Sequence, residues 1–357
     1  MKIKMIAALL ILALTLSTLL GCAGKKDDAD VHVFYYTYSD PYISTVRASL
    51  DKALDGAGIK YQDHDSNNNQ TTQTEQVQTA ITKGAKLLIV NIVTTGSDDA
   101  ASGIISLAKD AGIPVIFFNR EVSDGIVKSY DKCVFIGTDA SEAGKLQGDM
   151  IGDYVVKNYD KIDLNGDGEI SYVLFMGEKG NNEAIYRTKY SVENADKKLA
   201  AAGKKALKFY DASNKDKYLL DRDGKWSAQA ANEYMTTILS SHSTANKNMV
   251  ELVICNNDGM AEGAISALSS AGYNTGAEGA TTIPVFGVDA TSAAQALIRG
   301  GKMAGTIKQD AEGMAEAIQK CAKNAMDGKG LLDGMEDYNI DSGVDKVRIA
   351  YAVYLGE

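Results

Sequence analysis

The segment from Asp163 to Leu174 has the residue types and spacing of a calcium-binding loop. Positions one, three, five, seven and nine of such a loop supply oxygen ligands, and here they are Asp163, Asn165, Asp167, Glu169 (through its carbonyl) and Ser171. Gly168 at position six permits the tight turn. Position twelve, which normally carries a bidentate glutamate, is Leu174, so the last carboxylate must come from elsewhere. We predict a structural calcium ion, because no group nearby has the features of a metal-dependent catalytic site.

The N-terminus predicts export. Lys2 and Lys4 precede an unbroken run of apolar and hydroxyl residues over 6–20, as in a secretory signal peptide. The sequence Leu-Leu-Gly-Cys that ends at Cys22 is similar to a bacterial lipobox, in which the cysteine becomes the lipidated first residue. We therefore predict a signal peptide over 1–21, lipidation at Cys22 and a polar tether over 22–30. The protein would be anchored at the outer face of the cell membrane or in the periplasm.

Composition excludes several classes of protein. The chain has 37 basic and 47 acidic residues and a formal net charge of −10, and it lacks a basic cluster, which argues against binding to nucleic acid. Cys133, Cys255 and Cys321 lie in apolar patterns and are odd in number, so we expect buried thiols without disulfides. No second long apolar run follows the leader, so we expect no spanning helix in the mature chain.

Short β-rich runs alternate with helix-length stretches from residue 31 onward. We predict strands at 31–37, 86–91, 114–118, 133–136, 172–176, 207–210, 251–255 and 284–288, with helices at 42–54, 72–83, 97–111, 140–159, 183–201, 227–240 and 260–271. This alternation predicts an α/β fold of two similar doubly wound parallel-sheet domains joined by a hinge. The segments 113–119 and 283–289 match in layout, through either duplication or the general likeness of such strands.

Polar residues follow the strands at the edge where parallel sheets bind ligands. They are Asp40, Asn119, Asn181, Glu183, Asn257 and Asp289, with Tyr42 shortly after the first. Amides and carboxylates suit a ligand covered in hydroxyls, which both donate and accept. Each residue alone is equally typical of a helix N-cap, and we assign Asp258 to capping. Together they predict a polar small-molecule cleft, and the absence of HExxH, GxSxG, CxxC and phosphate-loop motifs favours binding over catalysis, with no catalytic residue.

From about Val31 to Tyr354 the chain resembles the periplasmic galactose/glucose-binding proteins of bacterial ABC importers. The landmarks are YTYSDPYISTVR, IPVIFFNRE, FIGTDASEAGKLQGD, DLNGDGEI, NNEAIYRT, VELVICNND and IPVFGVDA. The resemblance implies that a pyranose is hydrogen-bonded by Asp40, Asn119, Arg187, Asn257 and Asp289. It also implies that Tyr42 and Trp226 sandwich the sugar and that Glu251 supplies the missing calcium carboxylate. Without the resemblance, Trp226 could equally anchor its helix to the surface.

Several positions depart from the family pattern. Asn181 replaces a histidine, Glu183 an aspartate and Gln309 an asparagine, and all three are expected in the sugar site. Glu183 and Gln309 are each one methylene longer, which shifts their reach by about 1.5 Å. These changes affect the identity of the sugar more than its class. Ser171 is shorter than the usual ligand, which leaves open whether it binds calcium directly or through water.

The family fold implies two lobes built from discontinuous segments. We predict an N-terminal lobe of 31–137 plus 310–338 and a C-terminal lobe of 138–306 plus 346–357. The hinge segments would lie near 137–139, 306–310 and 339–345.

These features predict a monomeric solute-binding subunit of an ABC importer that closes over a hexose, glucose and/or galactose, and then engages the permease membrane subunits. A sensor that presents the sugar to a chemoreceptor or sensor kinase is the alternative, and partner binding distinguishes it. A secreted sugar-phosphate hydrolase would need a base and an open metal beside the substrate. A repressor of this fold would need a helix-turn-helix and no signal peptide. The sequence leaves open the preferred hexose, the anomer and the Gram type of the host.

Overall fold

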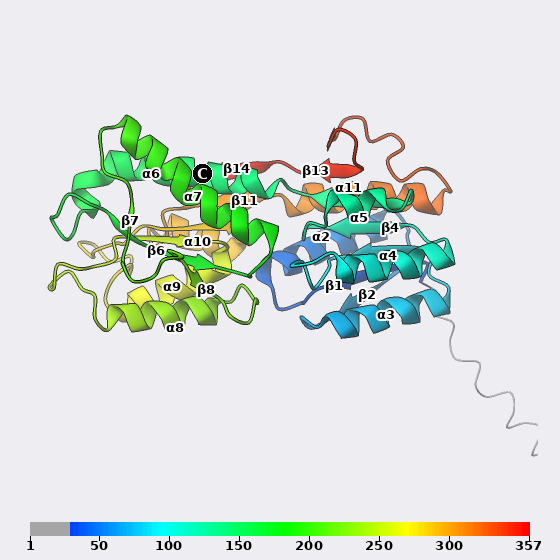
Figure 1. Ribbon diagram of the computed structural model, residues 1–357, viewed down its shortest axis with the longest axis horizontal. Helices are drawn as coiled ribbons and strands as arrows, with labels where there is room; N and C mark the ends of the chain where they lie inside the picture. The colour runs from blue at the N-terminus through cyan, green and yellow to red at the C-terminus, as the bar shows by residue number, and fades with distance from the viewer. Residues whose placement is uncertain (1–28) are drawn as a thin grey trace, which may run out of the picture.

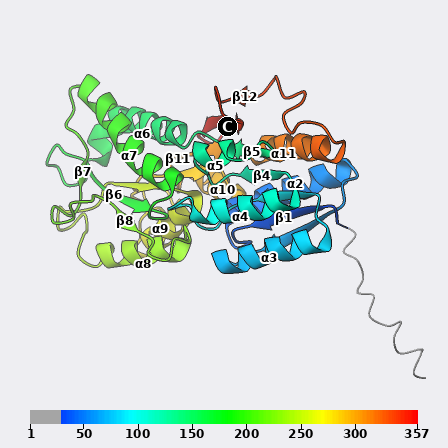
Figure 2. The ribbon, with the colours of Figure 1, turned by 45° about the vertical axis from the view of Figure 1, so that its right-hand side comes forward.

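The computed structural model describes residues 29–357, so the predicted signal peptide, the Cys22 lipidation site and most of the tether lie outside the described residues. Two α/β lobes lie side by side along the long axis of the molecule (Figure 1). Each lobe contains a seven-stranded sheet, mostly parallel, covered by helices on both faces. The turned view shows the same two bodies, with α3 and α4 in one and α6, α7 and α8 in the other (Figure 2). The predicted fold class is confirmed.

The first lobe has the strand order β12-β13-β5-β4-β3-β1-β2. Its elements are β1 (Val31–Tyr35), α2 (Pro41–Gly56), β2 (Tyr61–Asp65), α3 (Gln70–Lys83), β3 (Leu87–Val90), α4 (Asp99–Ala111), β4 (Val115–Phe118), α5 (Asp124–Lys128), β5 (Cys133–Gly137), α11 (Ala311–Met326), β12 (Asn339–Ile340) and β13 (Lys346–Arg348). The central strands are apolar on both faces because helices cover both. Gly84 and Gly112 end α3 and α4 in the left-handed conformation.

The second lobe has the order β14-β11-β10-β9-β6-β7, and β8 also pairs with β6. Its elements are α6 (Ala140–Ile162), β6 (Ser171–Met176), α7 (Asn182–Ala201), β7 (Lys208–Phe209), β8 (Leu219–Leu220), α8 (Ala228–Leu239), β9 (Leu252–Cys255), α9 (Asp258–Ser270), β10 (Val285–Asp289), α10 (Ser292–Arg299), β11 (Gly305–Gln309) and β14 (Tyr351–Tyr354). Helices α6 and α7 pack unusually closely, since a Cβ at Gly148 would lie 2.5 Å from the carbonyl oxygen of Tyr190. Nearer the start of α7, a Cβ at Gly144 would lie 2.4 Å from the carbonyl oxygen of Tyr186, and this part of α7 with its N-cap carries the pocket residues Asn181, Glu183 and Arg187.

Three chain crossings join the lobes, and one of them differs from its predicted place. The first connects β5 to α6 at 138–139, and the second lies between Gln309 at the end of β11 and Ala311 at the start of α11. The third lies at 349–350 and not at 339–345, because β13 pairs in parallel with β5 of the first sheet. The assignment of 346–357 to the second lobe is therefore wrong for Lys346–Arg348, and only β14 reaches the second sheet.

The core of each lobe consists of an apolar layer on either face of its sheet. Cys133, Cys255 and Cys321 are buried within these layers as free thiols, as expected from the sequence. In residues 29–357, none of the helices combines the length and the apolar character required to cross a membrane.

Candidate functional site

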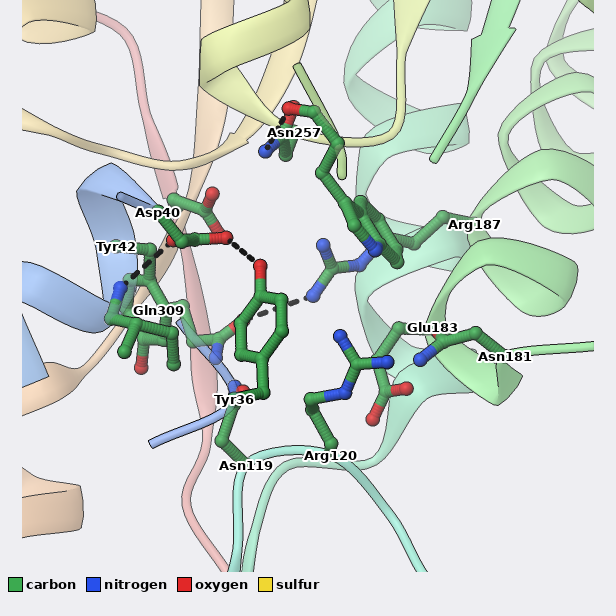
Figure 3. Close-up of a pocket in the computed structure, with 13 residues that line it drawn as sticks. Tyr36, Asp40, Tyr42, Asn119, Arg120, Asn181, Glu183, Arg187, Asn257 and Gln309 are labelled. Atoms are coloured by element: carbon green, nitrogen blue, oxygen red, sulfur yellow. Dashed lines mark hydrogen bonds between the residues drawn. The ribbon is translucent and has the colours of Figure 1, made fainter. Parts of the chain in front are cut away.

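A pocket lies between the two lobes, at the carboxyl ends of their strands. All ten residues predicted for the sugar site line it: Asp40, Tyr42, Asn119, Asn181, Glu183, Arg187, Trp226, Asn257, Asp289 and Gln309. Figure 3 shows side chains of both lobes directed toward this common space. Tyr36, Ile43 and Arg120 also line the pocket, and the sequence reasoning missed them.

Three of the pocket residues are also helix N-caps. Asp40 Oδ1 accepts a hydrogen bond from Ile43 N at 2.9 Å, Asn181 Oδ1 from Ala184 N at 3.0 Å, and Asn257 Oδ1 from Met260 N at 2.9 Å. Capping and ligand binding were alternative interpretations of these residues, yet the structure places each cap in the pocket wall. The starts of α2, α7 and α9 therefore converge on the pocket, where the positive ends of the helix dipoles favour electronegative ligand atoms.

Asp258 does not cap α9, which corrects the sequence assignment. Asn257 has the extended backbone of a cap, and Asp258 is the first helical residue. The buried Asp258 carboxylate accepts hydrogen bonds from Thr291 N at 2.8 Å and Thr306 Oγ1 at 2.6 Å. It thereby holds the turn that follows Asp289.

The turn around Asp289 has a strained backbone. Asp289 has φ 125° and Ala290 has φ 56°, both in the region that favours glycine. Asn119 and Trp226 also have positive φ, at 59° and 55°. Unusual backbone conformations of this kind persist where the surrounding structure fixes them, and they are common at binding sites. The orientations of three pocket side chains, Asn119, Trp226 and Asp289, thus depend on unusual local backbone conformations.

Arg187 is the most extensively bonded residue of the pocket. Its Nη1 donates to the carbonyl of Asn256 at 2.9 Å, and its Nη2 donates to Gln309 Oε1 at 2.9 Å and to the hydroxyl of Tyr351 at 3.0 Å. The Nε atom of Arg187 finds no partner among the described residues. A planar guanidinium fixed by its other nitrogens presents this donor in one orientation.

Five buried polar atoms of the pocket lack a hydrogen-bond partner among residues 29–357. They are Tyr42 Oη, Arg120 Nε, Glu183 Oε2, Arg187 Nε and Gln309 Nε2. An unsatisfied buried polar group costs roughly 1–3 kcal/mol, so native structures contain few of them. Their concentration in one cavity indicates a ligand that carries both donors and acceptors.

The aromatic side chains of Tyr42 and Trp226 come from opposite lobes. Trp226 is 8% exposed and lines the pocket, so it does not anchor its helix to an outer surface. A Cβ at Gly177 would lie 2.1 Å from the indole ring, so only glycine at this position leaves room for it. Two such rings offer apolar faces to the C–H groups of a ligand.

Two acidic groups of the pocket, Asp289 and Glu183, are strongly desolvated. Burial raises the pKa of Asp289 well above its usual value, and the positive charge of Arg187 opposes this shift. Burial likewise raises the pKa of Glu183, again opposed by Arg187. Burial alone would lower the pKa of Arg187, but Tyr351, Asp289 and Glu183 raise it. Hydroxyl donors of a ligand would stabilise the charged carboxylates in this setting.

The predicted calcium loop lies away from the pocket, between α6 and β6, and Glu251 reaches it as the resemblance implied. The fully buried Glu251 carboxylate accepts hydrogen bonds from Asn165 N at 2.8 Å and Ser171 N at 2.9 Å, and its Oε2 lies 3.1 Å from Ser171 Oγ. The Asp163 carboxylate accepts from the N–H groups of Gly166, Asp167 and Gly168. The loop and β9 are therefore already connected by hydrogen bonds.

The donor set of this loop suits a hard cation only in part. Carboxylate and carbonyl oxygens are the ligands that calcium prefers. However, Asn165 Oδ1 accepts from Met249 N at 2.7 Å, and Ser171 Oγ donates to the Met249 carbonyl at 2.6 Å. Within the described part of the chain, no group of three or more His, Cys, Asp or Glu side chains is arranged to hold a metal. Calcium binding stays a prediction.

Comparisons with known proteins identify relatives over most of the chain. A family model described as a periplasmic binding protein domain matches residues 31–330. The D-galactose/methyl-galactoside binding periplasmic protein MglB of Haemophilus influenzae is 35% identical over 318 residues, which cover 88% of this chain and 87% of that one. A putative rhizopine-binding protein of Rhizobium meliloti is 29% identical over 282 residues, 78% of each chain.

Solved structures share the fold. An ABC transporter solute-binding protein from Clostridium phytofermentans with bound β-D-glucose has a TM-score of 0.70 at 21% identity, covering 91% of this chain and 94% of that one. One from Bacillus halodurans with bound myo-inositol has a TM-score of 0.67 at 24% identity, covering 94% and 96%.

Proposed function

This chain belongs to the periplasmic binding protein family, a family of solute-binding proteins and not of enzymes, and we propose that it binds a hexose for an ABC importer. The observation that carries the proposal is the set of five unpaired buried polar atoms around one cavity that also holds Tyr42 and Trp226. A pyranose has hydroxyls that can bond the unpaired polar atoms and apolar C–H faces that can stack on the two aromatic rings. The 35% identity with a galactose-binding protein supports the same class of ligand.

Both lobes contribute to the proposed site. Asp40, Tyr42 and Asn119 belong to the first lobe, and the other seven predicted residues belong to the second. A sugar held by both sets stabilises the arrangement in which the lobes are close. The permease would recognise this closed arrangement, and a chemoreceptor could recognise the same surface.

Glucose and galactose are the proposed hexoses. Structural neighbours with this fold carry β-D-glucose or myo-inositol, and sequence relatives include ribose- and xylose-binding proteins. In this chain, Glu183 and Gln309 place a carboxylate oxygen and an amide nitrogen in the cavity, and both atoms lack protein partners. A six-carbon sugar has enough hydroxyls to reach them together with Asp40 and Asp289.

Isothermal titration of the purified protein with galactose, glucose, allose, ribose and myo-inositol tests the proposal. We expect galactose or glucose to bind at least tenfold more tightly than ribose, because a pentopyranose lacks the exocyclic hydroxymethyl group. Preferential binding of myo-inositol would contradict the hexose assignment, and the failure of all five ligands to bind would contradict the function.

We propose further that residues 1–21 direct export and that Cys22 carries a lipid. The basic start, apolar run and lipobox-like ending support this assignment. Mass spectrometry of the membrane fraction should find acylated Cys22 at the mature N-terminus, and Cys22→Ala should release the protein from the membrane. Recovery of an unmodified chain that begins elsewhere would contradict it.

We also propose a structural calcium ion held by Asp163, Asn165, Asp167, the Glu169 carbonyl, Ser171 and Glu251. The order of oxygens in the loop and the approach of the buried Glu251 carboxylate support it. The ion would connect the loop before β6 to the start of β9. Its effect would be on the stability of the second lobe, since the loop is separate from the pocket.

A further inference from the structure

Glu178 contacts both lobes and one wall of the pocket. It lies in the loop between β6 and α7, and its Oε1 accepts a hydrogen bond from the hydroxyl of Thr95 at 3.2 Å. Its Oε2 pairs with Arg120 and also accepts from Trp226 Nε1 at 3.4 Å. Thr95 and Arg120 belong to the first lobe, whereas Trp226 belongs to the second. One carboxylate therefore connects the opposite lobe to the pocket tryptophan.

Arg120 continues these contacts within the first lobe. Its Nη2 also donates to the carbonyl of Val93 at 2.9 Å, and its guanidinium carbon lies 4.2 Å from the centre of the Tyr36 ring. Tyr36 in turn donates its hydroxyl to Asp40 Oδ2 at 2.6 Å. Figure 3 shows Tyr36 and Arg120 side by side in the pocket wall.

The contacts form one connected path from Asp40 through Tyr36, Arg120 and Glu178 to Trp226. Both ends of the path are proposed sugar ligands from opposite lobes, and its middle is an ion pair across the cleft. The side chains of Arg120 and Glu178 are only 6% and 17% exposed. Water and salt therefore screen this pair weakly, and the loss of one partner leaves the other charge desolvated and unpaired.

We propose that Glu178 and Arg120 are positioning residues that set the sugar affinity, Glu178 without touching the sugar. The pair stabilises the closed arrangement of the lobes, and Glu178 fixes the indole of Trp226 for stacking. The proposal rests on the proposed hexose-binding function. Lysine could not replace Arg120, because one ammonium group cannot bond Glu178 and Val93 while stacking flat on Tyr36. Sequence reasoning missed both residues, since neither lies at a ligand position of the family pattern.

A double-mutant cycle tests the pair. Glu178→Gln, Arg120→Met and the double variant are titrated with the hexose that binds the wild-type protein best, and dissociation rates are measured by stopped-flow Trp226 fluorescence. Each single substitution should weaken binding about tenfold or more, mainly through faster dissociation. The double variant should bind no worse than the weaker single variant, because both changes remove the same interaction. Glu193→Gln, at an exposed position of α7, is the matched control and should bind like wild type.

Other outcomes overturn the proposal. If the effects of the two substitutions simply add, Arg120 acts through its own contact with the sugar and not through Glu178. If Glu178→Gln or the shorter Glu178→Asp melts well below the wild-type protein without sugar, the residue is needed for folding and not for closure. If the variants bind hexose like wild type, the pair has no role in affinity. Failure of the wild-type protein to bind any hexose contradicts the proposed function instead.

Discussion

Asp289 is the acidic residue on which sugar binding should depend most. It is buried, its backbone φ is 125°, and burial raises its carboxyl pKa. Hydroxyl groups that donate to the carboxylate favour its charged form, so sugar and protons compete at this group. We expect Asp289→Asn to weaken hexose binding about tenfold or more, since a charged acceptor is replaced by a neutral one.

The pH dependence gives a second check on Asp289. Because its pKa lies above the usual value, protonation occurs at a higher pH than for an exposed aspartate, and hexose affinity should decrease as the pH falls through this pKa. Titration calorimetry from alkaline pH down to the lowest pH at which the protein stays folded should show the decrease in wild type and a smaller one in Asp289→Asn. Asp160→Asn, an exposed change on α6, is the control. An unchanged wild-type affinity over this range would contradict the role of a buried carboxylate.

Trp226 should report and support binding, because it is the only tryptophan of the chain and lines the pocket. Stacking contributes roughly 0.5–1.5 kcal/mol beyond the burial of area, so Trp226→Ala should bind hexose about tenfold more weakly or worse. Trp226→Phe keeps an aromatic ring, so its hexose affinity should decrease less than that of Trp226→Ala. Intrinsic fluorescence should change on addition of sugar to the wild-type protein. Equal affinity in Trp226→Ala would place the ligand elsewhere.

Individual residues show what the sequence could and could not predict. Strand-end position identified seven of the pocket residues, counting Tyr42, because ligands of parallel sheets bind at that edge, whereas Arg187, Trp226 and Gln309 came from the family resemblance. Tyr36 and Arg120 were not predicted. Each lies close in sequence to a predicted ligand residue, but its position in the pocket depends on packing against residues of other segments. The sequence assigned the helix cap to Asp258, whereas Asn257 is the cap and α9 begins at Asp258. Both residues are polar and suitable as caps, so their types alone do not determine at which of the two the helix begins.

At the scale of elements, Glu251 connects the loop before β6 to β9 over a long chain separation. A metal that binds only the folded state stabilises it by roughly 2.7 kcal/mol at a hundredfold excess over its Kd. Chelation should therefore lower the melting temperature of wild type, whereas Glu251→Gln should respond little to added calcium. Hexose affinity should change modestly in both, because the loop is separate from the pocket. Loss of sugar binding on chelation at an unchanged melting temperature would place the ion in the sugar site.

The contact between α2 and β2 should make stability depend on pH. Burial raises the pKa of Asp63 on β2 to about 8, the charge of Asp51 on α2 and a hydrogen bond with it add to the shift, and Arg47 opposes it. The folded state thus favours the neutral carboxyl. The contribution of the neutral Asp63 carboxyl to the free energy of unfolding is fully present below the unfolded pKa of 3.8, and it is lost as the pH rises through the folded pKa of about 8.

Substitution of Asp63 tests the pH dependence. Asp63→Asn is neutral at every pH, so its melting temperature should exceed that of wild type at pH 9 and approach it at pH 4. Thermal unfolding at the two pH values measures the difference, and Asp55→Asn, an exposed change on α2, is the control. A variant less stable than wild type at both pH values would show that the carboxylate itself is required.

The position of the third chain crossing between the lobes could not be predicted from the sequence. Strand β13 has three residues, and its place in the first sheet depends on pairing with β5, some two hundred residues earlier in the chain. Long buried strands and capped helices can be predicted from their local residue pattern. The pattern of a short strand at a chain crossing is compatible with either sheet. The sequence could therefore indicate two lobes but not the residue at which the chain last passes between them.

At the scale of the whole molecule, the described structure has the two lobes in direct contact across the pocket. Asn181 Nδ2 donates to Thr95 Oγ1 at 3.2 Å, and Glu121 N donates to Glu183 Oε1 at 3.3 Å. The Arg120–Glu178 ion pair joins the same edge. Each contact connects a pocket residue or its neighbour to the opposite lobe. Ligand contacts and interlobe contacts are therefore formed by the same segments, so binding and closure should be coupled.

Distance measurements between the lobes should show this coupling directly. Thr94 of the first lobe and Asp223 of the second are exposed and line opposite sides of a groove between the lobes. The thiols of residues 29–357 are buried, so in a protein that lacks Cys22, cysteines placed at 94 and 223 accept spin labels selectively. Addition of hexose should narrow the label distance distribution and shift it to shorter values. With Asp289→Ala in the same labelled protein, the same sugar concentration should leave most molecules unshifted, because affinity and closure depend on one set of contacts. A distribution that sugar does not change in a protein shown to bind it would mean that the lobes are held together without ligand.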